Sequence, residues 1–254
     1  MRPRDAVSLE PFMPARFPAI GRGVVVVWNL WIGGTPDAER ARTVLAGDEL
    51  ARAASFVYDV HRNRYVAGRL ALRELLGRYL DLPPSAVQFR YSKYGKPELP
   101  GSTLRFNVAH SEDLAVIGLT AQDRLGVDVE RFRELQDIAG VARSVFSERE
   151  LDVFQALPGA LKIEGFFNCW TRKEAFVKAV GEGLSHPLDG FDVTLRPGEA
   201  VRLLEVEGST ARAAEWSLFD LRPIDGWVGA VAVENPEAAL VHAGWLGEPP
   251  PARD

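Results

Sequence analysis

The chain has 254 residues, 46% of them hydrophobic and 26% charged, which is typical of a soluble globular protein with one large domain or two small ones. Its formal net charge of −5 at pH 7, without a basic surface motif that also contains aromatic residues, argues against nucleic-acid binding. The single cysteine, Cys169, excludes an internal disulfide and predicts a cytoplasmic location.

The first part of the chain predicts one strand, then helices, then further strands. Val24–Ile32 is rich in β-branched residues and predicts a buried strand that is too short to span a membrane. Apolar residues at helical spacing predict a long helix over Arg62–Leu80. The other elements expected here are helices at Asp37–Ala46 and Asp48–Phe56 and strands at Val87–Tyr91, Leu104–Val108 and Leu114–Thr120. Arginines are frequent between residues 40 and 78, where they either bind an anionic ligand or solvate the helices.

The second part of the chain predicts a similar amount of helix and strand. Ser147 and Glu150 have the spacing of a capping box, which predicts the start of a helix. A long helix is expected over Leu161–Glu182, closed by Gly181 and Gly183. The remaining elements are a helix at Ala139–Val145 and strands at Val127–Glu130, Phe191–Leu195, Val201–Val206, Trp216–Asp220 and Val228–Val233.

Two acidic motifs in this second part indicate a common site. On a strand, Asp128 and Glu130 point to the same face, because successive side chains alternate between the two faces of the sheet. On the long helix, Trp170, Glu174 and Lys178 are four residues apart and share a face. Three carboxylates without a histidine or cysteine cluster suit Mg²⁺, and a neighbouring lysine suits a phosphate bound to that metal.

Ordinary structural roles can also explain these residues. Asp128 and Glu130 fit the solvated face of an edge strand. Glu174 and Lys178 fit a stabilising charge pair on a helix surface. The residues alone leave both interpretations open.

Five segments, in order along the chain, together resemble the Sfp-type 4′-phosphopantetheinyl transferases. They are Tyr94–Pro97, Phe106–Ser111, Gly126–Glu130, Phe146–Glu150 and Trp170–Lys178, with Gly181–Leu184 directly after the last. The resemblance implies an α+β pseudo-dimer of two similar halves, at residues 20–123 and 124–247, each with a small antiparallel sheet and a long helix. It places the active site in the cleft between them.

The resemblance also implies a reaction and the residues that perform it. The 4′-phosphopantetheine arm of coenzyme A moves to a carrier-protein serine, and adenosine 3′,5′-bisphosphate is released. The metal ligands would be Asp128, Glu130 and Glu174. The catalytic residues would be Glu174, as the base, and Lys178. The residues that contact coenzyme A would be Arg52, Arg64, Lys96, His110 and Lys178. For Lys173 two possibilities stay open, a contact with phosphate and exposure to solvent. Ala109 and Glu49 stand where relatives carry a serine and a basic residue, which puts coenzyme A contacts there in doubt.

The implied partners are coenzyme A and an apo acyl or peptidyl carrier protein, with the enzyme acting as a monomer. The sequence does not choose among fatty acid, polyketide and nonribosomal peptide synthesis. Candidates for carrier docking are apolar residues that could equally be core: Phe132, Val145, Phe146, Phe154 and Phe166. A Mg²⁺-dependent nucleotide pyrophosphohydrolase and a non-catalytic coenzyme A binding module are the alternative functions.

Overall fold

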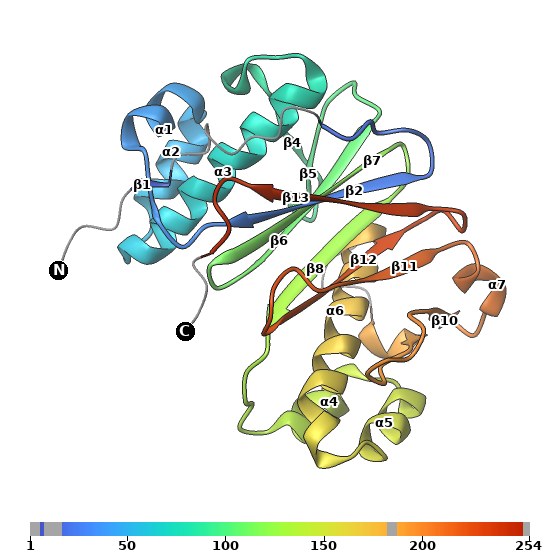
Figure 1. Ribbon diagram of the computed structural model, residues 1–254. Helices are drawn as coiled ribbons and strands as arrows, with labels where there is room; N and C mark the ends of the chain where they lie inside the picture. The colour runs from blue at the N-terminus through green and yellow to red at the C-terminus, as the bar shows by residue number, and fades with distance from the viewer. Residues whose placement is uncertain (1–5, 8–16, 182–186, 251–254) are drawn as a thin grey trace.

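A computed structural model describes residues 6–7, 17–181 and 187–250, and the described part is built from four layers (Figure 1). The long helix α3 (Asp59–Leu80) covers one face of a four-stranded sheet with strand order β13-β2-β7-β6. The other face of this sheet packs against a three-stranded sheet, β11-β12-β8, and the long helix α6 (Lys162–Val180) covers the far face of that second sheet. The α+β arrangement of two halves is confirmed.

The remaining elements surround these layers. The sheet strands are β2 (Val24–Trp31), β6 (Leu104–Ser111), β7 (Leu114–Ala121), β8 (Leu125–Arg131), β11 (Ser217–Leu221), β12 (Trp227–Val233) and β13 (Ala239–Leu246). Short strands pair β1 (Ala6–Val7) with β3 (Thr35–Pro36), β4 (Arg90–Tyr91) with β5 (Pro97–Glu98), and β9 (Phe191–Val193) with β10 (Leu203–Val206). The shorter helices are α1 (Ala38–Val44), α2 (Gly47–Ala54), α4 (Ile138–Val145), α5 (Glu148–Gln155) and α7 (Thr210–Ala213).

Strand β2 is apolar along its whole length because both of its faces are buried. Val26 and Trp28 pack with α3, whereas Val25 and Val27 pack in the cluster between the two sheets. A strand covered on both sides needs a continuous apolar run rather than an alternating one. The predicted strand Val24–Ile32 is therefore confirmed to within one residue.

Strand β13 was not expected from the sequence. It belongs to the C-terminal half of the chain, yet it pairs with β2 of the N-terminal half, and it does so in parallel. The expectation of a purely antiparallel sheet in the first half is wrong at this edge. The division of the chain at residues 123 and 124 stays our proposal, with β13 returning to the first sheet.

The boundaries of several other elements also differ from expectation. Only Arg90–Tyr91 of the expected strand Val87–Tyr91 is extended and paired. Strand β6 continues to Ser111, so His110 lies on a strand and not in a turn. Helix α6 ends at Val180, where Gly181 takes a left-handed φ of 82° as its C-cap; Glu182 and Gly183 lie outside the described residues.

The apolar residues considered for carrier docking are mostly core. Phe146, Phe154 and Phe166 are almost fully buried and pack against one another, with Val145 buried in the same cluster. Phe132 is partly buried and packs on the same cluster. These side chains hold α4, α5 and α6 together. The expectation that they dock the carrier protein is therefore wrong for the four buried residues, Val145, Phe146, Phe154 and Phe166. In the described part of the chain, no helix has the length and apolar character needed to cross a membrane.

Candidate active site

Strand β8 presents its acidic side chains to helix α6. Val127 and Val129 point into the cluster between the sheets, so alternation turns Gly126, Asp128 and Glu130 toward α6. Gly126 allows the close approach, because a Cβ there would lie 2.0 Å from the carbonyl oxygen of Ala175. A side chain at position 126 would push the strand away from the helix.

Asp128 is buried, and its only ion-pair partner among the described residues is Lys178. The Lys178 Nζ lies 2.6 Å from Asp128 Oδ1, while Oδ2 is buried with no hydrogen-bond partner in the described part of the chain. The pKa of Asp128 is raised to about 7, mainly by burial and to a smaller extent by the nearby carboxylates of Glu130 and Glu174, while Lys178 opposes this rise. An unpaired buried carboxylate oxygen is costly to keep and indicates a ligand position.

Glu130 and Glu174 flank Asp128 on two different elements. Ser111 donates its hydroxyl to Glu130 Oε2 at 2.9 Å, and the Arg133 guanidinium donates to the same oxygen at 2.9 Å. Glu174 is half-buried on α6, one turn before Lys178. In this conformation no three acidic, histidine or cysteine side chains among the described residues are close enough together to form a ready metal site. The expected charge pair between Glu174 and Lys178 gives way to the Lys178–Asp128 pair.

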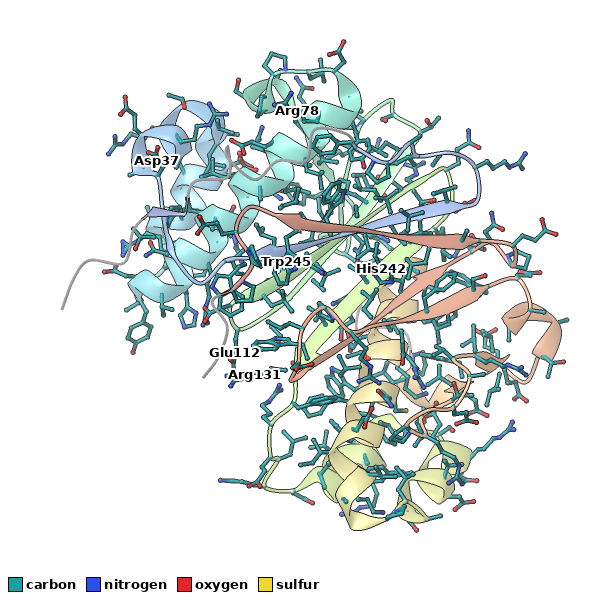
Figure 2. The ribbon with its side chains drawn as sticks, viewed as in Figure 1. Asp37, Arg78, Glu112, Arg131, His242 and Trp245 are labelled. Carbon is teal, nitrogen blue, oxygen red and sulfur yellow. The ribbon has the colours of Figure 1, made fainter. Side chains whose placement is uncertain are left out.

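His110 lies in the same electrostatic neighbourhood. His110 is exposed near the end of β6, and partial desolvation by its neighbours is the largest cause that lowers its pKa; the cations Lys178 and Arg64 lower it as well, while Glu130 raises it. Arg64 on α3 is held 2.8 Å from Asp113, in the turn after β6. Glu112, the residue before Asp113, links the same turn to β8, because it forms an ion pair with Arg131 at 2.5 Å (Figure 2). The structure therefore brings together His110, Arg64, Lys178 and the three carboxylates.

Arg52 and Lys96 have other neighbours. Arg52 is exposed on α2, where its guanidinium lies over the Phe56 ring at 6.0 Å. The Lys96 ammonium turns inward and donates to the backbone carbonyls of Lys178 and Leu125. Neither side chain is directed at the carboxylates, so their expected role in binding coenzyme A stays a prediction.

Lys173, whose role the sequence left open, has a structural role. It is fully buried, 2.7 Å from Glu150, and it also donates to the carbonyls of Leu188 and Phe191. The solvent alternative is therefore wrong, and these three contacts are all within the protein. Glu150 completes the capping box with Ser147, as the spacing predicted.

Glu49 and Ala109 are also packed into the fold. Glu49 is buried between Arg69 and Arg73, with Arg73 Nε 2.6 Å from its carboxylate. Ala109 is buried in the cluster between the sheets. Cys169 is fully buried, as expected for a small apolar residue, and burial raises the pKa of its thiol.

Sequence reasoning missed three polar residues that build the site. Asn107 accepts a hydrogen bond from the Val127 backbone at 2.8 Å and so joins β6 to β8 across the two halves. Ser111 and Arg133 orient Glu130. Asn107 and Ser111 are in the segment Phe106–Ser111 that carries the family resemblance. Their contacts depend on how β6 and β8, edge strands of two different sheets, pack on each other, which the sequence does not reveal.

The burial of Asp128 predicts that Asp128→Asn stabilises the metal-free protein at high pH. Its pKa is raised from 3.8 to about 7, so its favourable contribution to folding is complete below about pH 4 and is lost as the pH rises through 7. This rise in pKa corresponds to about 4 kcal/mol, so we expect the variant to gain about this much in the free energy of unfolding near pH 8 and almost nothing near pH 4. Urea denaturation in EDTA measures this; a variant less stable at both pH values would contradict it.

Comparison with known proteins identifies the family. The model of the 4′-phosphopantetheinyl transferase superfamily matches residues 124–232, and a model of the N-terminal part of 4′-phosphopantetheinyl transferase matches residues 29–122. The 4′-phosphopantetheinyl transferase HetI of Nostoc sp. is 40% identical over 193 residues, which cover 74% of this chain and 78% of that protein. The chain belongs to the 4′-phosphopantetheinyl transferase family.

Other members are more distant. The 4′-phosphopantetheinyl transferase Sfp of Bacillus subtilis is 28% identical over 158 residues, covering 62% of this chain and 69% of Sfp. The crystal structure of holo-[acyl-carrier-protein] synthase from Thermotoga maritima, at 20% identity, covers 44% of this chain and 62% of its own, with a TM-score of 0.34 too low to bear on the assignment.

The transferase thus moves phosphopantetheine from coenzyme A to a carrier protein. This confirms the family, the reaction and the use of coenzyme A that the sequence motifs predicted. It favours transfer over hydrolysis or coenzyme A binding without catalysis.

Proposed function

We propose that this transferase depends on Mg²⁺ held by Asp128, Glu130 and Glu174, and that it releases adenosine 3′,5′-bisphosphate. The observation that carries the proposal is the buried Asp128 Oδ2, which has no hydrogen-bond partner within the described residues. The donors available around it are carboxylate oxygens, which Mg²⁺ prefers. Burial is the main cause of the raised pKa of Asp128, and repulsion by Glu130 and Glu174 adds to it; a bound cation relieves both effects. The residues therefore fit the metal, provided that Lys178 moves off Asp128.

Bound there, Mg²⁺ supplies charge neutralisation for the coenzyme A pyrophosphate. Lys178 then donates its ammonium to a phosphate oxygen and offsets the charge that develops during transfer. Glu130 is kept in place by Ser111 and Arg133, which already occupy its Oε2. Catalysis by these groups is mainly positioning and electrostatic stabilisation.

Glu174 serves as the base in this proposal. Its carboxylate accepts the proton from the carrier serine Oγ as that oxygen attacks phosphorus. A carboxylate is a weak base, but the proton needs to leave only as the attack proceeds. Glu174 suits this because it is half-buried beside Asp128 rather than locked in a buried ion pair as Glu150 is.

His110 and Arg64 bind phosphate groups of coenzyme A in the same proposal. The lowered pKa of His110 leaves the imidazole neutral near pH 7, so it donates one N–H to a phosphate oxygen. Arg64 adds a permanent positive charge next to it, oriented by Asp113. Arg52 would contribute at the nucleotide end. The sequence motifs place Lys96 there as well, but its ammonium is held by the backbone carbonyls of Leu125 and Lys178.

The acceptor in our proposal is an apo acyl or peptidyl carrier protein, and the enzyme acts as a cytoplasmic monomer. A free, buried cysteine agrees with a reducing compartment. The pathway that the carrier serves stays open among fatty acid, polyketide and nonribosomal peptide synthesis.

Intact-mass measurement tests the proposal. The purified protein is incubated with coenzyme A, Mg²⁺ and a panel of apo carrier proteins, with EDTA and carrier Ser→Ala variants as controls. We expect one carrier to gain a single phosphopantetheine only when both metal and serine are present. Cleavage of coenzyme A without a carrier would instead support hydrolysis, and transfer undiminished in EDTA would overturn the metal site.

A further inference from the structure

Lys96 connects the two halves of the molecule through one ammonium group. It lies between β4 and β5 in the N-terminal half, and its Nζ lies 2.5 Å from the carbonyl oxygen of Lys178 and 3.0 Å from that of Leu125. Both carbonyls belong to the C-terminal half. Lys178 is in the last turn of α6, where carbonyl groups lack helical partners and a cation is favourable.

The turn that carries Lys96 is well anchored. The Ser92 N–H donates to the Lys96 carbonyl at 2.9 Å, and the Ser92 hydroxyl accepts from the Lys96 N–H at 3.2 Å. Gly95 supplies a φ of 81° that this turn requires, and Pro97 restricts the backbone that follows. The ammonium therefore acts from a fixed point, with its stem half-buried.

The two carbonyls are attached to the elements that carry the carboxylates. Leu125 begins β8, three residues before Asp128, and Lys178 is the residue whose own side chain pairs with Asp128. The close packing of Gly126 on Ala175 lies at the same junction. One ammonium thus sets how β8 and α6 lie relative to each other at the point where the site is built.

We propose that Lys96 is a positioning residue, whose ammonium holds the end of α6 against the start of β8 so that Lys178 and Glu174 face Asp128 and Glu130. This rests on the proposed function of those four residues. It differs from the nucleotide contact expected for Lys96, because both of its hydrogen bonds go to protein carbonyls.

The charges around Lys96 make this contact sensitive to pH. Burial lowers the pKa of Lys96 to about 8; Arg124 and Arg105 lower it as well, while Glu98 raises it. These groups come from β5, β6 and the segment before β8, and α6 contributes the Lys178 carbonyl. Above about pH 8 the amine is neutral, and its hydrogen bonds lose the strength that a charged donor gives.

The test compares Lys96→Met with Lys162→Met. Lys162 is a matched control, because its Nζ also donates to two carbonyls at a helix end, Phe154 at 2.6 Å and Gln155 at 2.8 Å, but within one half. We expect K96M to lower kcat about 10- to 100-fold, since a small misplacement is enough. Its affinity for adenosine 3′,5′-bisphosphate, measured by calorimetry, should stay within about twofold of the wild type. K162M should lose a similar amount of thermal stability and keep kcat.

Lys96→Arg adds a second measurement, the pH dependence of kcat, which a change in stability alone would not alter. Its guanidinium stays charged, so kcat should persist above pH 8, where that of the wild type declines. This variant also decides the question if K96M does not fold. An unchanged alkaline decline in K96R would overturn the proposal, as would a K96M that weakens bisphosphate binding at normal kcat, which would make Lys96 a nucleotide ligand. A kcat loss equal in K162M would make the role merely structural. If the wild type transfers nothing to any carrier, the proposed function fails instead.

Discussion

Replacing Glu174 with glutamine should lower kcat for transfer about a thousandfold while leaving the folded structure and its stability nearly unchanged. Glutamine has the same shape but cannot accept the serine proton, and it removes one negative charge from the proposed metal ligands. Glu174 is half-buried and makes none of the buried ion pairs that stabilise α6, so the fold should tolerate the change. Single-turnover transfer to an apo carrier, followed by mass, measures the effect.

Glu164→Gln is the matched control on the same helix. Glu164 pairs with Arg222 at 3.1 Å on a partly exposed surface, and its loss should change kcat by less than about twofold. A Mg²⁺ titration of E174Q then separates the two roles of Glu174. If high Mg²⁺ restores the rate, Glu174 is a ligand and not the base; if E174Q retains a third of the wild-type rate, neither role stands.

The candidate site could be predicted from the sequence where local geometry decides it. The alternation of a strand placed Asp128 and Glu130 on one face, and the helical repeat placed Glu174 and Lys178 on another. The structure brings these two faces together because Gly126 lets β8 and α6 approach closely. The sequence shows this glycine, but it does not show which helix packs against it.

The sequence could not predict which partners the long charged side chains reach. Lys173 and Lys178 are on the same helix, yet one is buried against Glu150 and the other reaches Asp128. Lys96 turns inward to backbone carbonyls, and Glu49 is buried between two arginines. In each case the partner is far along the chain, and a flexible stem can reach several of them.

Strand β13 shows a similar limit in the backbone. Its residues alternate between exposed and half-buried positions, and Gly244 interrupts its register with β2. Such a strand has weak β-propensity signals of its own and forms because the edge of β2 is available.

Lys173→Met should cost about 3 to 5 kcal/mol of the free energy of unfolding, because it leaves the Glu150 carboxylate buried without its cation. Burial already raises the pKa of Glu150 above 4.5 against the opposing effect of Lys173, so removing the lysine raises it further. The cost should therefore grow as the pH rises above about 5, where keeping Glu150 ionised becomes necessary. Urea denaturation at two pH values measures this.

The Glu150→Gln and Lys173→Met double variant completes the cycle. Removing both charges should recover much of the lost stability, since neither is then left unpaired. At a temperature where K173M is folded, its kcat should stay within about twofold of the wild type, because Lys173 reaches Glu150 and the carbonyls of Leu188 and Phe191 rather than the carboxylates around Asp128. A stable K173M with a large loss of kcat would instead make Lys173 a phosphate ligand. If K173M keeps its kcat, then of these two lysines, five residues apart on α6, only Lys178 is left to act in the reaction, and Lys173 stabilises the fold.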